Sequence, residues 1–123
     1  MGTSVALVIE DEQDLATIFS KAVSDAGYEV EVINNGEAAE KRLKAIVPDL
    51  VFLDLHLPGI DGGELLKRIR ADDRLSKTFI MVASADSAFT NAVQDKADLT
   101  LVKPISYQQL NRMAERIHAR KQQ

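Results

Sequence analysis

The sequence predicts an α/β fold in which a doubly wound sheet of five parallel strands is flanked by five helices. Two observations predict it: short apolar runs alternate with helical patterns along all 123 residues, and most of these runs are continuously apolar. A continuous apolar run suits a central parallel strand, because helices cover both faces of such a sheet. Strands that alternate with helices form right-handed crossover units, which makes the strands parallel.

Five segments are predicted as strands. Residues 5–9, 50–53, 79–83 and 99–102 are apolar or nearly so, and several are rich in β-branched side chains. Residues 28–33 read YEVEVI, an alternation of apolar and acidic side chains that is typical of a strand with one wetter face. We therefore expect that strand at an edge of the sheet.

Apolar residues spaced three or four apart predict helices between the strands. The five stripes are Leu15, Ile18, Phe19, Ala22 and Ala26; Ala39, Leu43 and Ile46; Leu65, Leu66 and Ile69; Ala88, Ala92 and Val93; and Leu110, Met113, Ala114 and Ile117. Gly27 follows the first stripe as a C-terminal cap, and Pro48 ends the second helix. Ser106 and Gln109 form a capping box before the last helix.

Composition and charge narrow the class of protein. Lys and Arg number 15 against 19 Asp and Glu, a net charge of −4, and 46% of residues are hydrophobic, as in an ordinary soluble domain. The absence of cysteine excludes disulfides, thiolate metal sites and cysteine nucleophiles. Mild acidity argues against direct nucleic-acid binding, which needs clustered Lys and Arg.

The chain is predicted to be a single domain spanning residues 1–123, with a core over about 4–119 and a basic polar tail at 120–123. Its apolar runs are well short of the roughly 20 residues that cross a bilayer. No basic region precedes the first apolar run, as a secretory signal would require. We therefore expect a cytoplasmic protein without a membrane partner.

Polar side chains follow four of the predicted strands at their carboxyl ends. Glu10 and Asp11 follow the first strand and Asp54 the third, whereas Ser84 follows the fourth and Lys103 the fifth. In a doubly wound sheet, ligands bind at this edge. The sequence therefore predicts one rim that gathers three carboxylates, a hydroxyl and a lysine.

These residue types together suit phosphoryl transfer. Converging carboxylates repel one another and favour a hard divalent cation such as Mg²⁺. A lysine supplies a point charge for a phosphoryl group, and a hydroxyl can donate to one of its oxygens. Asp54 is then a candidate nucleophile, since carboxylates form aspartyl phosphates in several enzyme classes.

Four motifs stand in order along the chain, each at the end of a predicted strand: VIEDE at 8–12, FLDLHLPGIDG at 52–62, MVASA at 81–85 and LVKP at 101–104. The chain resembles the receiver domain of two-component response regulators, the chemotaxis-regulator-like fold. The resemblance covers essentially the whole chain. It implies a flavodoxin-like sheet with the strand order 2-1-3-4-5, and a signalling domain rather than a turnover enzyme.

The resemblance assigns a role to each residue of the rim. It implies that Asp54 accepts a phosphoryl group from a histidine kinase or a phosphotransfer protein. Ser84 then corresponds to the hydroxyl that moves onto the phosphoryl group, and Lys103 to its cationic partner. Pro104 follows that lysine, at a peptide bond that is often cis in the family. The domain would then switch a surface that binds a downstream protein target or output domain.

The resemblance also implies a metal site for Mg²⁺, with Mn²⁺ as a possible substitute. Asp11 and Asp54 correspond to direct ligands, and the backbone carbonyl of His56 completes the protein's part. Glu10 occupies the outer acid position, which usually reaches the metal through water.

The sequence departs from the family pattern near the predicted switch. Thr100 stands where the family usually carries an aromatic that moves inward on phosphorylation. The segment from Ser84 to Lys103 is shorter than usual by about three residues, close to one helical turn, which predicts a short fourth helix. His56 and Asp86 stand where the family tunes the access of water to the phosphoryl group.

Other interpretations of the same residues stay open. The chain could be a degenerate receiver that binds proteins without phosphorylation, which Thr100 favours. A hydrolase with an aspartyl phosphate would carry a second aspartate at position 56, where this chain has His56. A flavin carrier on the same sheet would bind a phosphate after the first strand, where residues 10–14 are mostly acidic and would repel it.

Simpler structural roles are also considered. Ser84 could be an ordinary turn hydroxyl, Lys103 could form a salt bridge to Asp54, and His56 could be a polar loop residue. No role is assigned to His118. Three residues are interpreted as turn glycines rather than a phosphate loop: Gly59, Gly62 and Gly63.

Overall fold

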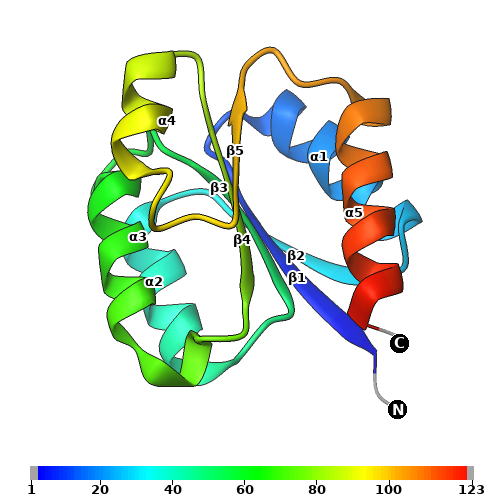
Figure 1. Ribbon diagram of the computed structural model, residues 1–123, viewed down its shortest axis with the longest axis horizontal. Helices are drawn as coiled ribbons and strands as arrows, with labels where there is room; N and C mark the ends of the chain where they lie inside the picture. The colour runs from blue at the N-terminus through cyan, green and yellow to red at the C-terminus, as the bar shows by residue number, and fades with distance from the viewer. Residues whose placement is uncertain (1–2, 122–123) are drawn as a thin grey trace.

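Strands and helices alternate along residues 3–121, the part of the chain that the computed structural model describes (Figure 1). The strands are β1 (Ser4–Ile9), β2 (Tyr28–Ile33), β3 (Leu50–Asp54), β4 (Phe79–Ser84) and β5 (Leu99–Val102). The helices are α1 (Gln13–Asp25), α2 (Gly36–Ala45), α3 (Gly62–Ala71), α4 (Ser87–Val93) and α5 (Tyr107–Lys121), with a 3-10 turn at Asp73–Leu75. Each predicted strand lies within one residue of its observed bounds.

The five strands form one parallel sheet in the order β2-β1-β3-β4-β5. This confirms the predicted doubly wound sheet and its strand order. β2 lies at one edge, as its alternating sequence predicted, and β5 lies at the other. The central strands β1, β3 and β4 carry the continuous apolar runs, and Leu7, Phe52 and Met81 are fully buried in them.

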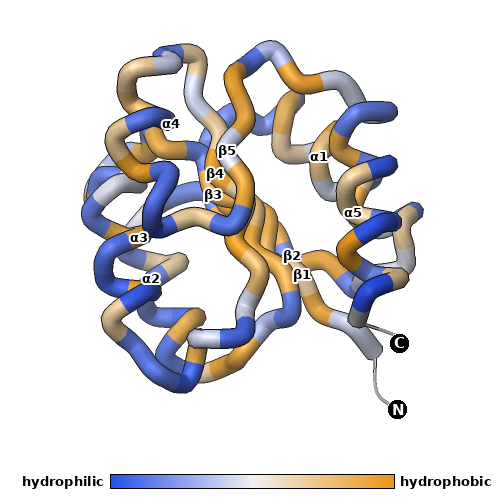
Figure 2. Tube along the Cα trace, viewed as in Figure 1, coloured by the Kyte–Doolittle hydropathy of each residue, from blue (hydrophilic) through white to orange (hydrophobic). Residues whose placement is uncertain are grey.

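Helices cover both faces of the sheet and close two apolar cores. Figure 1 shows α1 and α5 on one side of the sheet and α2, α3 and α4 on the other. Phe19 and Leu110 pack into the first core, and Leu43, Leu66 and Val93 into the second. In Figure 2 the hydrophobic colour follows the sheet, and the hydrophilic colour marks the outer sides of the helices. Burial on both faces is the condition that parallel strands require.

Side-chain caps define where several helices begin. Ser106 Oγ accepts a hydrogen bond from Gln109 N at 3.0 Å, and Gln109 Oε1 accepts one from Ser106 N at 3.2 Å, so the predicted capping box is confirmed. Asn35 and Asp86 accept bonds from the first turns of α2 and α4. Gly27, with φ +114°, follows the end of α1 as predicted.

The structure corrects the interpretation of two glycines. Gly62 and Gly63 are the first residues of α3 and are buried, whereas Gly59, with φ +78°, does lie in a turn. The cause is Asp61, whose Oδ1 accepts a hydrogen bond from Gly63 N at 3.2 Å and starts the helix before its apolar stripe begins.

The fourth helix is short, as predicted: α4 has 7 residues. The predicted polar tail at 120–123 is helical in its first two residues, because α5 continues through Lys121. Residues 122 and 123 lie outside the described part of the chain. Within residues 3–121, none of the helices combines the length and the apolar composition that crossing a membrane requires.

Candidate functional site

The carboxyl ends of four strands meet at one rim of the sheet. Pairing sets Asp54 opposite Ala83, and Ser84 opposite Val102. Backbone bonds continue this order past the strand ends: Glu10 N donates to the carbonyl of Ile33 at 3.0 Å, and Lys103 N donates to the carbonyl of Ser84 at 2.9 Å. The backbone therefore holds the residues that follow the strands at one edge.

Three carboxylates cluster at this rim. One oxygen from each of Glu10, Asp11 and Asp54 lies within 4.8 Å of the others. Glu10 is 1% exposed and Asp54 4%, whereas Asp11 is exposed. Neighbouring buried carboxylates repel one another and lose hydration, so the site requires a positive charge.

Lys103 supplies part of that charge. Its ammonium nitrogen lies 3.1 Å from Oε1 of Glu10 and 3.6 Å from Oδ1 of Asp54. The salt bridge between Lys103 and Asp54 that the sequence left open is therefore present. Burial nevertheless raises the pKa of Glu10 to about 7, and the hydrogen bond from Lys103 only partly opposes this, while the nearby charge of Asp54 adds to it.

The segment after Asp54 folds closely around this carboxylate. The backbone N–H of His56 donates to Oδ1 of Asp54 at 3.1 Å, and Gly62 N donates to the carbonyl of Leu55 at 3.2 Å. A Cβ placed on Gly62 would lie 2.5 Å from Cα of Leu55 and 2.7 Å from the carbonyl oxygen of Asp54. The start of α3 can therefore approach the end of β3 only because this residue has no side chain.

Ser84 ends β4 and is fully buried. Its Oγ accepts a hydrogen bond from Asp86 N at 3.0 Å, so the turn role considered for this hydroxyl is present. The same Oγ lies 2.8 Å from Nε2 of His56. Asp86 turns its own carboxylate to Ala88 N at 2.9 Å and caps α4.

The imidazole of His56 is the site feature that the sequence did not predict. Besides its bond to Ser84, the ring meets Phe89 of α4 edge-on, with ring centroids 5.0 Å apart and planes at 67°. A histidine two residues after a strand carries no periodic signal that would indicate where its ring points. His56 is thus an exposed loop residue, as the simpler interpretation held, whose ring also contacts Ser84 and Phe89.

The remaining predicted positions lie near the rim. Thr100 is half-buried in the middle of β5 and pairs with Val82. The peptide bond between Lys103 and Pro104 is cis. The structure thus places carboxylates, hydroxyl and lysine together, whereas Thr100 pairs two residues before Ser84 and lies deeper in the sheet.

The donor atoms of the rim suit a hard cation. Carboxylate oxygens from Glu10, Asp11 and Asp54 are the ligand type that Mg²⁺ and Mn²⁺ take, and like charges this close gain from a cation among them. Oxygen donors converging at the same edge as a lysine and a hydroxyl can bind a cation together with an anionic group.

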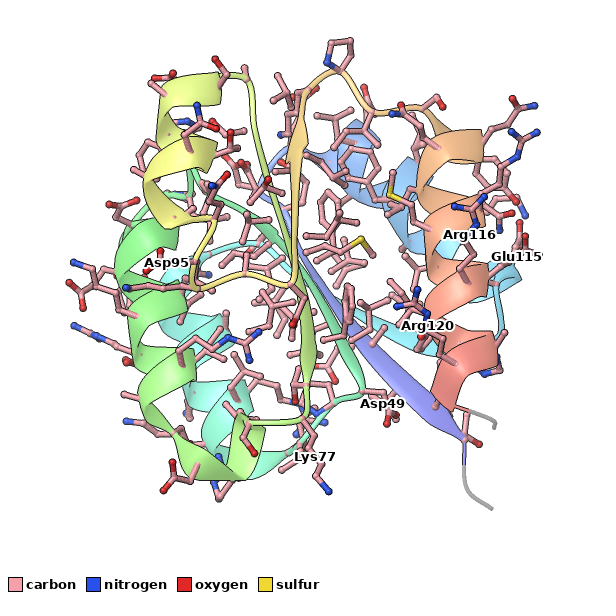
Figure 3. All side chains as sticks on the ribbon, in the orientation of Figure 1. Asp49, Lys77, Asp95, Glu115, Arg116 and Arg120 are labelled. Atoms are coloured by element: carbon pink, nitrogen blue, oxygen red, sulfur yellow. The ribbon has the colours of Figure 1, made fainter. Side chains whose placement is uncertain are left out.

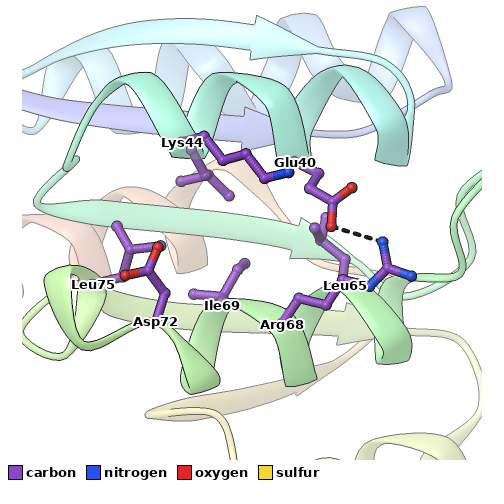
Figure 4. Close-up of a pocket in the computed structure, with 8 residues that line it drawn as sticks. Glu40, Lys44, Leu65, Arg68, Ile69, Asp72 and Leu75 are labelled. Atoms are coloured by element: carbon purple, nitrogen blue, oxygen red, sulfur yellow. Dashed lines mark hydrogen bonds and ion pairs between the residues drawn. The ribbon is translucent and has the colours of Figure 1, made fainter.

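Other hollows lie away from this rim. Figure 4 shows one of about 60 Å³ between α2 and α3, where Arg68 bridges to Glu40 at 2.7 Å. Another, between β5 and α5, is lined in part by Arg116 and Arg120, which Figure 3 labels on α5. None of the predicted site residues lines either hollow.

Comparison with known proteins identifies the family of the chain. A family model described as the response regulator receiver domain matches residues 6–115. The phosphate regulon transcriptional regulatory protein PhoB of Rhizobium meliloti is 35% identical over 106 residues, which cover 84% of this chain and 47% of that protein. The chain spans about half the length of the curated relatives it matches.

Solved structures show the same fold. A structure described as a response regulator from Chloroflexus aurantiacus matches with a TM-score of 0.86 and 29% identity, covering 96% of this chain and 99% of that one. The receiver domain of sensor histidine kinase PA1611 from Pseudomonas aeruginosa, solved with a magnesium ion in its active-site cleft, matches with a TM-score of 0.83 and 24% identity, covering 95% and 99%. The chain belongs to the family of response regulator receiver domains of two-component signalling systems.

Proposed function

We propose that Asp54 is the residue of this receiver domain that accepts a phosphoryl group. The observation that carries the proposal is the setting of this carboxylate at the end of β3, where it is 4% exposed and lies 3.6 Å from the ammonium of Lys103. Burying a carboxylate beside two others costs free energy. Groups held at such a cost are concentrated at functional sites. The donor is the phosphohistidine of a histidine kinase or of a phosphotransfer protein.

The transfer is a displacement at phosphorus. An Oδ atom of Asp54 forms a bond to phosphorus while the bond from phosphorus to the histidine nitrogen breaks, and the released imidazole keeps the electron pair and takes up a proton. Lys103 donates to a phosphoryl oxygen from its place beside Asp54. The hydroxyl of Ser84 donates to a second oxygen.

The acidic cluster would hold a divalent cation, Mg²⁺ or Mn²⁺. Asp11 and Asp54 would bind it directly, with the backbone carbonyl of His56, and Glu10 through water. When bound, the cation supplies the positive charge that lets a phosphoryl group lie among carboxylates. Support comes from the oxygen donors clustered within 4.8 Å of one another, and from the magnesium ion in the cleft of the PA1611 receiver domain, which shares the fold.

Receiver domains are signalling domains, and this one is proposed to catalyse its own phosphorylation and dephosphorylation rather than to turn over a substrate. Its output is a contact with a downstream protein target or an output domain. A phosphoryl group adds about 1.5 to 2 negative charges at the rim, enough to rearrange hydrogen bonds that now involve neutral groups.

Phosphorylation by acetyl phosphate, a small donor, tests the proposal. We expect a hydroxylamine-sensitive phosphoprotein that forms with Mg²⁺, fails to form when the metal is chelated, and is lost in Asp54→Asn. Asp73→Asn makes the same chemical change at an exposed aspartate in the 3-10 turn after α3, and we expect it to be modified like the wild type. An unmodified wild-type protein, or an unchanged yield in Asp54→Asn, would refute the proposal.

A second candidate is a receiver that binds its partner without phosphorylation. The half-buried Thr100 favours it, because this residue has no ring that could move inward. The 7-residue α4 favours it as well, because the helix is shorter than the family resemblance implies. The same experiment separates the two candidates, since this one requires no modification of Asp54.

A further inference from the structure

A chain of side-chain contacts leads from Ser84 to the outer surface of α4. Ser84 Oγ lies 2.8 Å from Nε2 of His56, and the His56 ring meets the ring of Phe89 edge-on at a centroid distance of 5.0 Å. Phe89 lies in α4 and lines a hollow of about 320 Å³ between α3 and α4. A buried hydroxyl at the proposed phosphorylation site is thus linked to a surface groove through two rings.

We propose that His56 is a positioning residue that holds the Ser84 hydroxyl while Asp54 is unmodified. Phosphorylation of Asp54 then transfers this hydroxyl from His56 to the phosphoryl group. The loss of this bond releases the Phe89 ring at the α3–α4 groove. The inference rests on the proposed function of Asp54. It assigns to His56 and Phe89 the route by which the modified site reaches the groove between α3 and α4.

The exchange follows from the relative strength of the two hydrogen bonds. The proposed contact requires the neutral His56 tautomer with its proton on Nδ1, so that Nε2 accepts the hydroxyl proton of Ser84. Ser84 has only this one proton to donate, while its oxygen accepts the bond from Asp86 N at 3.0 Å. A hydroxyl that donates to a charged phosphoryl oxygen makes a bond roughly twice as strong as a neutral one. Serine lacks the methyl group that restricts threonine, so Oγ can turn about a single bond toward Asp54. His56 is exposed, so its ring nitrogen can bind water when the Ser84 hydroxyl turns away.

Phe89 is placed to respond to that exchange. Its ring lies between His56 and the start of α3, where a Cβ on Gly63 would be 3.4 Å from Cε1 of Phe89. α4 is also tied to Ser84 by a second path, because Asp86 both donates its backbone N–H to Ser84 and caps the helix. A helix of only 7 residues offers little resistance to a shift of its first turn.

The position of the Phe89 ring indicates on which side of α4 the surface changes when Asp54 is phosphorylated. β5 offers the half-buried Thr100, which has no ring to move. In the described part of the chain, the aromatic residue in ring contact with the site is Phe89. The change at the protein surface is therefore expected between α3 and α4 rather than between α4 and β5.

Affinity for beryllofluoride with Mg²⁺, a mimic of the phosphoryl group, tests the role of His56. His56→Phe keeps a ring beside Phe89 and the backbone carbonyl but removes the bond to Ser84. We expect binding about two- to tenfold tighter than in the wild type, the equivalent of one neutral hydrogen bond that no longer competes. In the Ser84→Ala background the same substitution is expected to change the affinity by less than twofold, because His56 then has no hydroxyl to hold.

His118→Phe is the matched control. His118 also meets an aromatic ring edge-on, Tyr28 at 5.1 Å and 73°, but it lies on α5 outside the rim. It is expected to bind beryllofluoride like the wild type. Unchanged or weaker binding by His56→Phe, or tighter binding of equal size in the Ser84→Ala background, would overturn the proposal. His56→Asn, a second variant that removes the ring, separates loss of the bond from any effect of the added phenyl group, and it too is expected to bind more tightly.

The resonances of the Phe89 ring, followed by NMR as beryllofluoride and Mg²⁺ are added, test the route. We expect a shift in the wild type and in His118→Phe, and less than half of that shift in His56→Phe and Ser84→Ala. Resonances near Asp54 that respond while Phe89 stays unchanged would overturn the inference and leave the proposed function intact. If no resonance near Asp54 responds and acetyl phosphate leaves the protein unmodified, the proposed function fails and the inference falls with it.

Discussion

The ammonium group of Lys103 lies 3.1 Å from a carboxylate oxygen of Glu10, a residue that is 1% exposed. Removing the ammonium in Lys103→Met keeps most of the side-chain length but leaves Glu10 and Asp54 without their cation. We expect the free energy of unfolding, measured by urea denaturation in metal-free buffer, to fall by about 1–3 kcal/mol. The loss is limited because Glu10 can take up a proton in place of the ion pair.

Lys21→Met is the matched control for Lys103→Met. Lys21 pairs with Asp25 on the surface of α1 at 3.3 Å, with side chains 70% and 40% exposed. Exposed pairs of this kind contribute little, so its loss is expected to stay within about 0.5 kcal/mol. Equal stabilities of the two lysine variants would contradict the importance of the buried charge at the rim.

Because Gly62 lies so close to the end of β3, alanine substitutions at Gly62 and at its neighbour Gly63 are expected to have different effects. A Cβ at Gly62 would lie 2.5 Å from Cα of Leu55, so Gly62→Ala must displace the segment that follows Asp54. We expect a loss of about 1–3 kcal/mol in the free energy of unfolding. Phosphorylation by acetyl phosphate, followed by phosphate-affinity electrophoresis, is expected to slow by roughly 10- to 100-fold because the acceptor moves.

Gly63→Ala makes the same change one residue later. The added Cβ would meet Phe89 at 3.4 Å, which is ordinary contact with a side chain. Because alanine favours the helix over glycine, stability is expected to be unchanged or to rise by up to about 1 kcal/mol. If Gly62→Ala were tolerated as well as Gly63→Ala, the tight packing of α3 against β3 would not matter for the site.

The rim could be predicted from the sequence because its residues follow directly from strand ends. Asp54 and Lys103 come after apolar runs whose periodicity marks them as parallel strands, and parallel strands end at one edge. The same rule placed Glu10 and Asp11. The prediction required only the direction and order of the strands, which local patterns and the family resemblance indicate.

Contacts that depend on side-chain direction could not be predicted in this way. The bond between His56 and Ser84 joins residues 28 positions apart, through the orientation of an exposed ring in a loop. His118, to which the sequence assigned no role, packs against Tyr28 because α5 packs along α1 and places the His118 ring beside Gly27. Such pairs arise from tertiary packing, and neither helical nor strand periodicity reports them.

Arg70 closes the short connection between α4 and β5. Its Nε donates to the carbonyl of Lys96 at 2.7 Å, and its Nη2 lies 2.7 Å from Oδ2 of Asp98, which also accepts the backbone N–H of Ile80. Arg70→Lys replaces the planar guanidinium group, whose several N–H donors make these bonds at the same time, with a single ammonium group. We expect a loss of about 1–2 kcal/mol in the free energy of unfolding, and faster hydrogen exchange over residues 94–102.

Arg68→Lys changes the same residue type two positions earlier in α3. Arg68 pairs with Glu40 and Glu64 with its side chain 48% exposed, so we expect a change of at most about 0.5 kcal/mol and unaltered exchange near β5. Exchange in residues 94–102 that stays the same in Arg70→Lys would show that the connection holds without this arginine.

The buried phenol of Tyr28 is expected to make the folded protein less stable in alkaline solution. Its hydroxyl is buried without a hydrogen-bond partner among the described residues, and burial, with a smaller effect of Asp49, raises the pKa of this phenol from 10.0 to about 12. The folded state therefore keeps the phenolic proton to a higher pH than the unfolded chain does. Stability from this group is fully present below pH 10 and falls as the pH rises toward about 12.

Urea denaturation of Tyr28→Phe, repeated across that pH range, measures the effect. At neutral pH the variant is expected to equal the wild type or exceed it by up to about 1 kcal/mol, because a buried hydroxyl without a partner is removed. Between pH 10 and 12 it is expected to lose less stability than the wild type. Tyr107→Phe keeps Tyr28 and removes an exposed hydroxyl whose bond to Asp25 also raises its pKa. This variant should lose only the share of the alkaline loss that comes from Tyr107 and retain the share that comes from Tyr28. A Tyr28→Phe variant that loses as much stability as the wild type would show that the alkaline transition comes from other groups.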